Sequence, residues 1–426
     1  MRNLVIKNGR VIDPSVDRDE HADLYVVDGR ISDQPPAADY REIEARDLIV
    51  APGLIDIHVH LREPGQIQKE TIETGSRAAA AGGFATIVCM PNTDPPADNP
   101  STITLITDRI RDTAKINVYP AGAITKNLMG DEMAPIGSMV QAGIVAITDD
   151  GHCVQNHELM RRAVEYARMF DLAVFDHCQD YNMVGNGVVH EGYWSTVLGL
   201  AGWPRIGEEI MVARNILLSD LCRTRLHCQH LSSAGSVRLL RDARARGIQV
   251  TGEICPHHIA LTDERISSFD TNYKMNPPLR TQEDVEALID GVADGTITIL
   301  ASDHAPHAFF EKEVEFDRAP FGISGLETEL ALFLTILVHQ QKAIDLKRLI
   351  ALYTINPATL TRLPKGTLQK GVDADITLID PDLEWVFRKQ ESLSRSQNTP
   401  FDGWKLKGRA VQTIVGGETV WELGKS

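Results

Sequence analysis

The middle of the chain alternates between short apolar runs and segments with helical periodicity. Helix-period patterns occur, for example, at 158–169 and 237–246, and an Ala-rich one covers 77–81. The apolar runs of strand length lie at 54–60, 85–90, 116–124, 144–148, 172–177, 225–230, 250–255 and 296–303. Eight strand–helix units over roughly 300 residues predict a TIM-type (β/α)8 barrel. A doubly wound open sheet is the alternative, but it would usually carry a glycine-rich phosphate-binding motif, and none is visible.

The two ends of the chain share a different pattern. Short β segments lie at 4–6, 22–26, 48–50, 375–379 and 411–415. Neither terminal piece can bury a core alone. We therefore expect an α/β protein in which residues 1–52 and 363–426 together form one small β-sandwich domain, and residues 53–362 form the barrel as an insertion.

Composition narrows the class of protein. The 426 residues are 43% hydrophobic and 24% charged, which suits a large globular enzyme rather than a disordered or fibrous chain. The formal net charge is −16, without a Lys/Arg-rich run, so nucleic acid and anionic membrane surfaces are not expected as partners. An anionic substrate would need a local basic group.

Targeting signals and cysteine usage predict a cytoplasmic protein. Residues 1–10 contain no apolar signal core, and no uninterrupted apolar run reaches ~18 residues. The cysteines are scattered without CxxC spacing, at Cys89, Cys153, Cys178, Cys222, Cys228 and Cys255. In a chain of this length they are typical of reduced core thiols rather than of a disulfide framework.

The predicted strand at 54–60 ends in informative residues. Apolar positions alternate with Asp56, His58 and His60, so these side chains point the same way in a strand of period two. Two imidazoles at one strand end can bind a single divalent metal ion. Arg62 follows in the same phase, where its planar guanidinium could hold a substrate carboxylate. An HxH pair alone is more often two ordinary histidines than a metal site. Whether this pair binds a metal ion therefore depends on the residues at the other strand ends.

Several other predicted strands also end in polar side chains. In chain order these are Asn92, Asp149, Asp150, His177, His230, Asp303, His304 and His307. In TIM barrels the active site lies at the carboxyl ends of the strands. Unpaired buried charges cost several kcal/mol each. Polar residues at five strand ends that share one mouth therefore indicate a site rather than core filling.

The chemistry of these residues favours a pair of metal ions. The nitrogen and carboxylate ligands are His58, His60, Asp150, His177, His230 and Asp303, a set that suits two Zn²⁺-class ions ~3.5–4 Å apart. Asp150 is the candidate bridge, because a carboxylate can bind one ion through each oxygen; Asp149 is its competitor, and the residues alone do not choose. A bridging water would have its pKa lowered to about 7. Asp303 could take its proton and pass it to a leaving nitrogen.

Five motifs of the chain resemble the signatures of type I dihydroorotases in the amidohydrolase superfamily. They lie at 58–65 (HVHLREPG), 91–93 (PNT), 148–151 (TDDG), 276–280 (NPPLR) and 303–307 (DHAPH). The resemblance spans essentially the whole chain, and the first and last motifs are highly specific in this order and spacing. It implies the reversible cyclisation of N-carbamoyl-L-aspartate to (S)-dihydroorotate with loss of water, a step of de novo pyrimidine (UMP) synthesis.

The resemblance also implies a role for each matching residue. The zinc ligands would be His58, His60, Asp150, His177, His230 and Asp303. The two histidines of the first motif and Asp303 would hold the more buried ion, and Asp150 would bridge it to a second ion held by the other two histidines. Asp303 would also be the catalytic acid and base. The implied substrate contacts are His60, Arg62, Asn92, Asn276, His307, Phe321 and Gly322.

One position separates branches of this superfamily. Hydantoinases, dihydropyrimidinases and allantoinases carry a carboxylated lysine as the metal bridge at the end of strand four. Residues 144–150 contain no lysine, and an aspartate takes that place, as in type I dihydroorotases. Lys126 follows the third predicted strand, which is the wrong strand for a replacement bridge.

Two alternative functions stay open. The first is another cyclic-amide hydrolase, allantoinase-like or hydantoinase-like, although Arg62 with Asn92 favours a ring that bears a carboxylate. The second is a non-catalytic dihydroorotase-like partner of aspartate transcarbamoylase; such proteins have typically lost metal ligands, whereas every ligand position is filled here. Besides the small-molecule substrate, a second copy of this chain and aspartate transcarbamoylase are the partners to test.

Other polar residues have plainer interpretations. His257 and His258 follow the seventh predicted strand and are expected to support ligands or to pack. His190 is expected on the surface. The charged segment 309–321 is expected to be a solvated loop, with a mobile lid over the site as the alternative.

Overall fold

Eight parallel strands form a barrel in the middle of the chain. In the computed structural model, which describes residues 2–425, their order is β15-β14-β13-β10-β9-β8-β7-β6. A parallel bridge between Val59 and His304 joins the two ends of this row. The predicted TIM-type barrel is therefore confirmed. The strands are β6 Leu54–Val59, β7 Phe84–Cys89, β8 Asn117–Gly122, β9 Ala146–Ile147, β10 Ala173–Asp176, β13 Leu226–Cys228, β14 Val250–Ile254 and β15 Ile299–Leu300.

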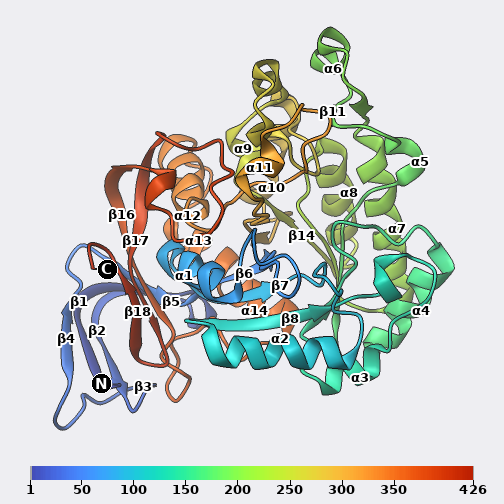
Figure 1. The fold of residues 1–426 in the computed structure, drawn as a ribbon. Coiled ribbons are helices and arrows are strands. Elements are labelled where there is room, and N and C mark those ends of the chain that lie inside the picture. The colour runs from blue at the N-terminus through green and yellow to red at the C-terminus, as the bar shows by residue number, and fades with distance from the viewer. Residues whose placement is uncertain (1, 426) are drawn as a thin grey trace.

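Helices cover the outside of the barrel (Figure 1). Those after the first strands begin at side-chain caps: Asn99 accepts backbone N–H bonds at the start of α2, and Asn156 does so at the start of α4. The larger helices are α1 Ile72–Gly82, α2 Pro100–Thr113, α3 Ile136–Gln141, α4 His157–Arg168, α7 Ile206–Cys222, α8 Ala234–Ala245, α10 Gln282–Ala293, α13 Leu346–Tyr353 and α14 Ile355–Thr361. Helix α12, Glu329–Phe333, continues as a π-helix over Leu334–Gln340.

Short elements are inserted at the carboxyl end of the barrel. They are α5 Tyr181–Val184, β11 Val189–His190, α6 Tyr193–Leu198, β12 Gly202–Trp203, α9 His257–Ala260 and α11 Phe309–Lys312. Strands β11 and β12 pair in parallel as a separate two-stranded sheet. Figure 1 shows α6 and β11 projecting from the body of the molecule, at the top of the view.

A second sheet is built from both ends of the chain. Its order is β18-β17-β16-β5-β1-β2-β3, with β4 also paired to β1. Strand β5 lies between β1 and β16, so N-terminal and C-terminal strands share one sheet, and Figure 1 shows both termini beside it. Its strands are β1 Leu4–Asp13, β2 Arg18–Val27, β3 Arg30–Ser32, β4 Arg41–Glu44, β5 Ile49–Pro52, β16 Ile376–Val386, β17 Lys405–Val415 and β18 Glu418–Glu422. The shared small β domain is confirmed, and its boundaries at 52/53 and 362/363 stay predictions.

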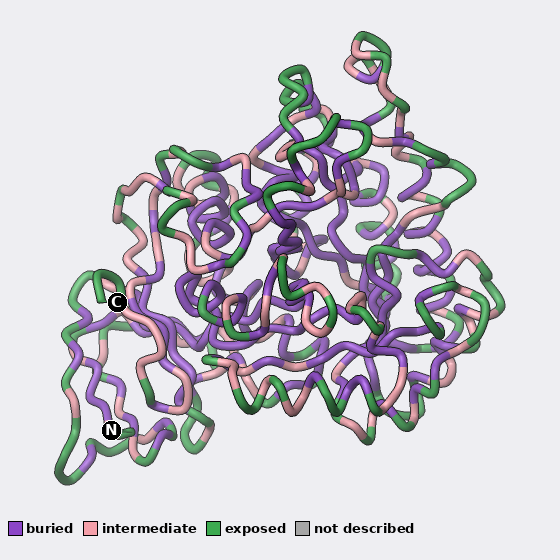
Figure 2. Tube along the Cα trace, viewed as in Figure 1, coloured by how far each residue is buried: buried purple, intermediate pink, exposed green. Residues whose placement is uncertain are grey.

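The core explains why the barrel strands are apolar without interruption. Every residue of β6 and β7 is buried, because parallel strands of a barrel are covered on both faces. Inside the barrel, Ile55, Val88, Phe175 and Ile299 belong to one apolar cluster. Figure 2 shows buried chain running through the middle of the molecule and exposed chain mainly at its outside. The polar side chains of β6 are therefore held in a dry interior.

Within residues 2–425, no helix is both long enough and apolar enough to cross a membrane.

One expectation about loops is wrong, and a second holds only in part. His190 is buried rather than on the surface, because Arg280 packs against it with Nη1 3.0 Å from His190 Nδ1.

The segment 309–321 is not simply solvated: it contains α11, and the Lys312 ammonium is buried. Lys312 Nζ donates to the carbonyl oxygens of Pro320, at 2.8 Å, and Thr271, at 3.0 Å. These bonds anchor the segment, and its proposed movement as a lid stays a prediction.

The contact between barrel and small sheet generates a stability prediction at Gly83, which ends α1 with φ +96°. A Cβ here would lie 2.8 Å from Ala410 Cβ and 3.1 Å from Thr377 Cγ2, both on C-terminal strands. Gly83→Ala should lower the free energy of unfolding by about 1 kcal/mol for the left-handed backbone and by a further ~1–3 kcal/mol for overpacking. Gly247→Ala is the matched control, because Gly247 has φ +76° and open space around it. Equal shifts of the two urea-unfolding curves would contradict the close packing at Gly83.

Candidate metal centre

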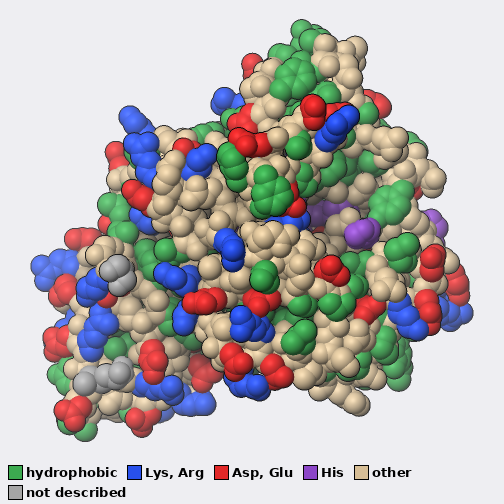
Figure 3. Space-filling model, in the orientation of Figure 1, with side chains coloured by type: hydrophobic (Ala, Val, Ile, Leu, Met, Phe, Trp, Pro, Cys, Tyr) green, Lys and Arg blue, Asp and Glu red, His purple; other side chains and the backbone are tan. Residues whose placement is uncertain are grey.

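Six polar side chains from five strand ends converge at one mouth of the barrel. Each is at most 6% exposed. Figure 3 shows histidine side chains at a hollow on this face of the molecule. The six side chains are His58 and His60 at the end of β6, Asp150 after β9, His177 after β10, His230 after β13 and Asp303 after β15. The structure thus brings together every residue that the sequence nominated as a metal ligand.

The first half of the centre lies at the seam where the barrel closes. His60 Nε2 is 3.1 Å from Asp303 Oδ1, and His58 Nε2 is 3.4 Å from the same oxygen. Ligands of a tetrahedral zinc ion lie about 3.3–3.6 Å apart when its bonds are about 2.0–2.2 Å long. Asp303 has φ +45° and His230 has φ +32°. Such left-handed backbone in non-glycine residues is typical of functional sites.

Asp150 lies between the two halves of the centre. Its Oδ2 is 3.2 Å from His60 Nε2, whereas its Oδ1 is 3.7 Å from both His177 Nδ1 and His230 Nε2. Oδ1 is buried without a hydrogen-bond partner among the described residues. Oδ1 is also 3.3 Å from His58 Nε2, so this carboxylate contacts imidazoles of both halves of the centre, as a bridging ligand must. His177 Nδ1 and His230 Nε2 are only 2.7 Å apart, so a shared ion would spread them slightly.

The two other candidates for the bridging ligand, Asp149 and Lys126, make contacts outside the centre. Asp149 Oδ1 accepts the backbone N–H groups of Ile124, at 2.7 Å, and Thr125, at 3.0 Å. This carboxylate therefore joins two barrel loops and does not face the imidazoles. Lys126 is exposed and pairs with Glu132. The structure thus favours Asp150, a choice that the residue types alone did not make.

Hydrogen-bond acceptors fix the direction of three of the imidazoles. His58 Nδ1 lies 2.6 Å from Glu253 Oε1, and His60 Nδ1 lies 2.8 Å from Asn92 Oδ1. His177 Nε2 lies 2.8 Å from Gln179 Oε1. Because each acceptor takes the N–H of the outer nitrogen, the inner nitrogen carries the lone pair. Lone pairs from both halves of the site are thereby aimed at Asp150, as in a metal site and unlike in a packed core.

Both key carboxylates are ionised. Burial opposes ionisation of Glu253, but the charges and hydrogen bonds of His58 and His227 outweigh it and lower its pKa to about 2. Burial likewise opposes ionisation of Asp303, and the neighbouring imidazoles of His58 and His60 nevertheless hold its pKa below the ordinary value. The centre therefore combines carboxylate oxygen and imidazole nitrogen, the donor set that Zn²⁺-class ions prefer.

The nominated substrate contacts surround the centre. Arg62 is buried with φ +60°, and burial lowers its pKa to about 10, so it stays cationic at pH 7. Asn92 already uses its Oδ1 on His60, so it also positions a ligand. Asn276 Nδ2 donates to Gln179 Oε1 at 3.2 Å, and its own Oδ1 is buried without a partner. Arg62 is thus a local cation within an acidic protein.

The remaining contacts form one hydrogen-bonded group. His307 Nε2 donates to the Phe321 carbonyl at 2.8 Å, which leaves the buried His307 Nδ1 without a partner. Gly322 has φ +117°, and a Cβ there would lie 2.5 Å from Ala305 Cβ. Asn398 donates to the carbonyls of Ala305 and Gly322, both at 3.1 Å, and accepts the His307 N–H at 3.0 Å. A residue from the C-terminal stretch thus shapes the mouth of the barrel.

Sequence reasoning missed three supporting residues. Glu253 had a usable signal, because it is a charged residue inside an apolar run that ends at a strand mouth. Gln179 lies two residues after His177, but a glutamine in a loop carries no distinct signal. Asn398 could not have been found, since it lies in a different predicted domain and reaches the site only through the tertiary fold.

The link between Glu253 and His58 generates a prediction about metal retention. Glu253→Gln keeps the shape but removes the charge that favours the Nδ1–H form of His58. We expect metal affinity to fall by about 10–100-fold, measured by metal analysis after dialysis against graded chelator. Glu327→Gln is the matched control, because Glu327 is a half-buried carboxylate that accepts hydrogen bonds from Ser392 and Leu393 and contacts no ligand. Equal retention in the two variants would contradict the role given to Glu253.

Comparison with known proteins places these residues in a family. The Dihydro-orotase-like family profile matches residues 47–236, and the Amidohydrolase family profile matches residues 224–421. The dihydroorotase of Syntrophotalea carbinolica is 49% identical over 423 residues, which cover 99% of each chain. The dihydroorotase of Pelotomaculum thermopropionicum is 50% identical over 422 residues, which cover 98% of each chain.

Solved structures agree on the architecture. An L-hydantoinase (dihydropyrimidinase) from Arthrobacter aurescens has a TM-score of 0.89 at 26% identity and covers 100% of this chain and 97% of its own. A dihydropyrimidinase from Brevibacillus agri has a TM-score of 0.86 at 24% identity, covers 99% of this chain and 95% of its own, and supports the fold alone. With near-half identity over almost its full length to named dihydroorotases, this chain belongs to the dihydroorotase family of amidohydrolases.

Proposed function

We propose that this chain is a metal-dependent dihydroorotase, which interconverts N-carbamoyl-L-aspartate and (S)-dihydroorotate in pyrimidine biosynthesis. The observation that carries the proposal is the complete donor set around Asp150, with an aspartate rather than a lysine at the bridging position. The near-full-length identity to relatives named dihydroorotase supports the same substrate.

The residues present fit a pair of Zn²⁺-class ions. Two overlapping groups, one of His58, His60 and Asp303 and one of His58, Asp150 and His230, each offer ligand atoms within 4.8 Å of one another. His177 would complete the second group. When bound, such ions supply Lewis-acid polarisation of a carbonyl and lower the pKa of water to about 7. We propose zinc as the ion, with two per chain when fully loaded.

Asp303 is proposed as the acid and base. In the hydrolytic direction, water adds to the ring amide carbon while Asp303 accepts the water proton, and the C–N bond then breaks as Asp303 delivers that proton to the leaving nitrogen. In the direction of synthesis, the carbamoyl nitrogen attacks the side-chain carboxyl carbon and water leaves. The carboxylate form of Asp303, favoured by His58 and His60, is the form that the hydrolytic direction requires.

Arg62 and Asn92 are proposed to hold the carboxylate that the ring carries. The Arg62 guanidinium is a buried cation near the centre, and its fixed fork matches a carboxylate. Asn276 Oδ1 and His307 Nδ1 are buried and lack partners among the described residues, so they are free to pair with polar atoms of the ring. The backbone at Phe321 and Gly322 would contact the ring itself.

The alternatives are less well supported. Hydantoinases are similar in fold, yet a ring without a carboxylate would leave the buried Arg62 guanidinium with only the Pro306 carbonyl, at 3.3 Å, as a hydrogen-bond acceptor. A non-catalytic partner of aspartate transcarbamoylase would not need a complete ligand set. Association with that enzyme and formation of a homodimer stay predictions.

Replacement of the proposed acid and base gives the first test. Asp303→Ala should lower turnover of dihydroorotate by at least about 10²–10⁴-fold, the usual contribution of a positioned acid or base, without unfolding the chain. Ring-opening assays together with circular dichroism measure both effects. Glu327→Gln is again the control and should keep its turnover. Near-normal rates in Asp303→Ala would refute the assignment.

The aspartate bridge gives a second test. Since Asp150 takes the place of a carboxylated lysine, removal of CO₂ from the buffers should leave metal content and turnover unchanged, and added bicarbonate should not raise either. Turnover after metal reloading in CO₂-free buffer is the measurement. Activity that disappears in that buffer and returns with bicarbonate would show that a lysine is the bridge after all.

A further inference from the structure

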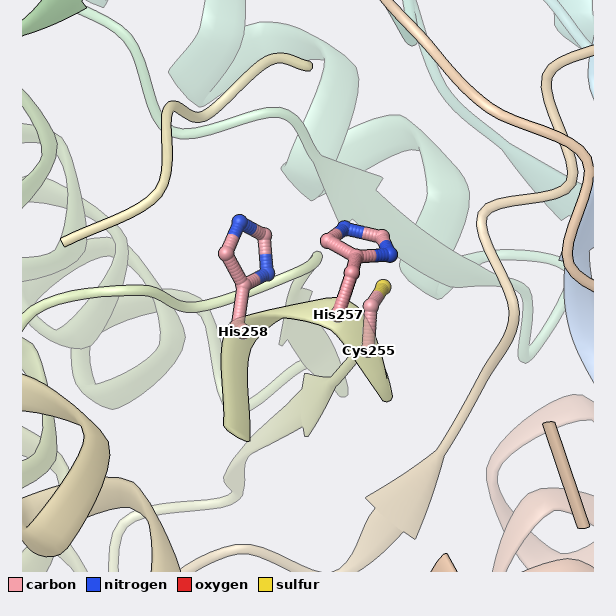
Figure 4. A group of neighbouring side chains, drawn as sticks. All are labelled: Cys255, His257 and His258. Carbon is pink, nitrogen blue, oxygen red and sulfur yellow. The ribbon is translucent and has the colours of Figure 1, made fainter. Parts of the chain in front are cut away.

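A second group of metal-type side chains lies where β14 ends, outside the donor set described above. Cys255, His257 and His258 each offer one ligand atom, and these atoms lie within 4.8 Å of one another. Figure 4 shows Cys255 just after β14, and His257 and His258 at the start of α9. All three are almost completely buried, with exposed fractions of 0%, 1% and 2%.

The hydrogen bonds of these histidines leave their lone pairs free. His258 Nε2 donates to the Pro277 carbonyl at 3.0 Å, so its Nδ1 carries the lone pair. That Nδ1 has no partner among the described residues, and neither nitrogen of His257 has one. Burial lowers the pKa of His257 to about 4 and that of His258 well below its ordinary value. Both imidazoles are therefore neutral near pH 7, which is the form that binds a metal ion.

Packing alone does not account for this arrangement. A buried polar atom without a partner costs about 1–3 kcal/mol, and native proteins leave few of them. Here three nitrogen atoms of two adjacent imidazoles are unpaired, and the ring centroids are 4.3 Å apart. A cation would satisfy one nitrogen of each ring at once, together with the sulfur of Cys255.

The donor set specifies the class of cation. One thiolate and two imidazoles suit Zn²⁺ or a softer ion, and they suit Mg²⁺ or Ca²⁺ poorly. In a tetrahedral site with Zn–S near 2.3 Å and Zn–N near 2.0–2.1 Å, the ligand atoms lie about 3.3–3.6 Å apart. The ligand atoms would therefore need to close in by at most about 1.2–1.5 Å.

We propose that Cys255, His257 and His258 bind a Zn²⁺-class cation that is distinct from the pair proposed around Asp150. Burial raises the pKa of the Cys255 thiol well above its ordinary value, so the thiol carries a proton before the cation binds. It would release that proton to solvent as the sulfur–metal bond forms. The cation would fix the end of β14 two residues beyond Glu253, the residue that orients His58.

Sulfur distinguishes this site from the proposed pair, whose donors are all nitrogen and oxygen. X-ray absorption at the zinc edge of the zinc-loaded full chain should show a sulfur neighbour near 2.3 Å beside the nitrogen and oxygen shell. Cobalt-loaded protein should show thiolate charge-transfer absorption in the near ultraviolet. In Cys255→Ser both signals should disappear, and the bound metal should fall by about one ion per chain.

Two other buried cysteines provide matched controls. Cys178 and Cys228 are buried as well, and Asn215 Nδ2 lies 3.3 Å and 3.9 Å from their sulfurs. Cys178→Ser and Cys228→Ser should keep the sulfur signals. The proposal is overturned if the wild-type chain shows no sulfur neighbour, if the signals persist in Cys255→Ser, or if either control variant loses them. The wild-type spectrum alone decides the first of these outcomes, even if a variant does not fold.

Discussion

The centre depends on one buried carboxylate that lies behind its ligands. Glu253 Oε1 takes the Nδ1–H of His58 and also accepts the backbone N–H of His230 at 3.2 Å, while Oε2 lies 2.9 Å from His227 Nε2. This side chain on β14 therefore connects the ends of β6 and β13. An ionised carboxylate in a dry interior has to be fully paired. The requirement fixes the position of one histidine from each half of the site.

A second carboxylate, on the first barrel strand, holds the seam of the barrel. Asp56 Oδ1 accepts the N–H of His58 at 2.9 Å, and Oδ2 accepts the N–H of Ser302 at 3.3 Å. Burial raises the pKa of Asp56 to about 7. The backbone next to His58 and the backbone next to Asp303 are thus tied to the same side chain. Ligand geometry and barrel closure are consequently set by the same contacts.

The local sequence pattern predicted the barrel strands and most of the site, and it failed where a residue's environment depends on contacts with residues far away in the sequence. The eight apolar runs became the eight barrel strands, because parallel strands buried on both faces need uninterrupted apolar sequence. Their polar ends converged because all strands of such a barrel end at one rim. The sequence did not distinguish Asp150 from Asp149 as the bridge, since only the fold shows that the backbone N–H of Thr125 donates a hydrogen bond to the Asp149 carboxylate. His190 was misplaced because its burial depends on Arg280, which lies far along the chain.

The strand order of the small sheet has a consequence for biosynthesis. Strand β5 lies between β1, which is made early, and β16, which is made only after the entire barrel. As the chain leaves the ribosome, one edge of β5 is exposed throughout translation of the barrel, and open edges of this kind invite pairing with other chains. Asn398, also made late, then reaches the barrel mouth. Nascent chains are therefore most in need of a chaperone before the final strands emerge, and an incomplete chain would have neither a closed sheet nor a finished mouth.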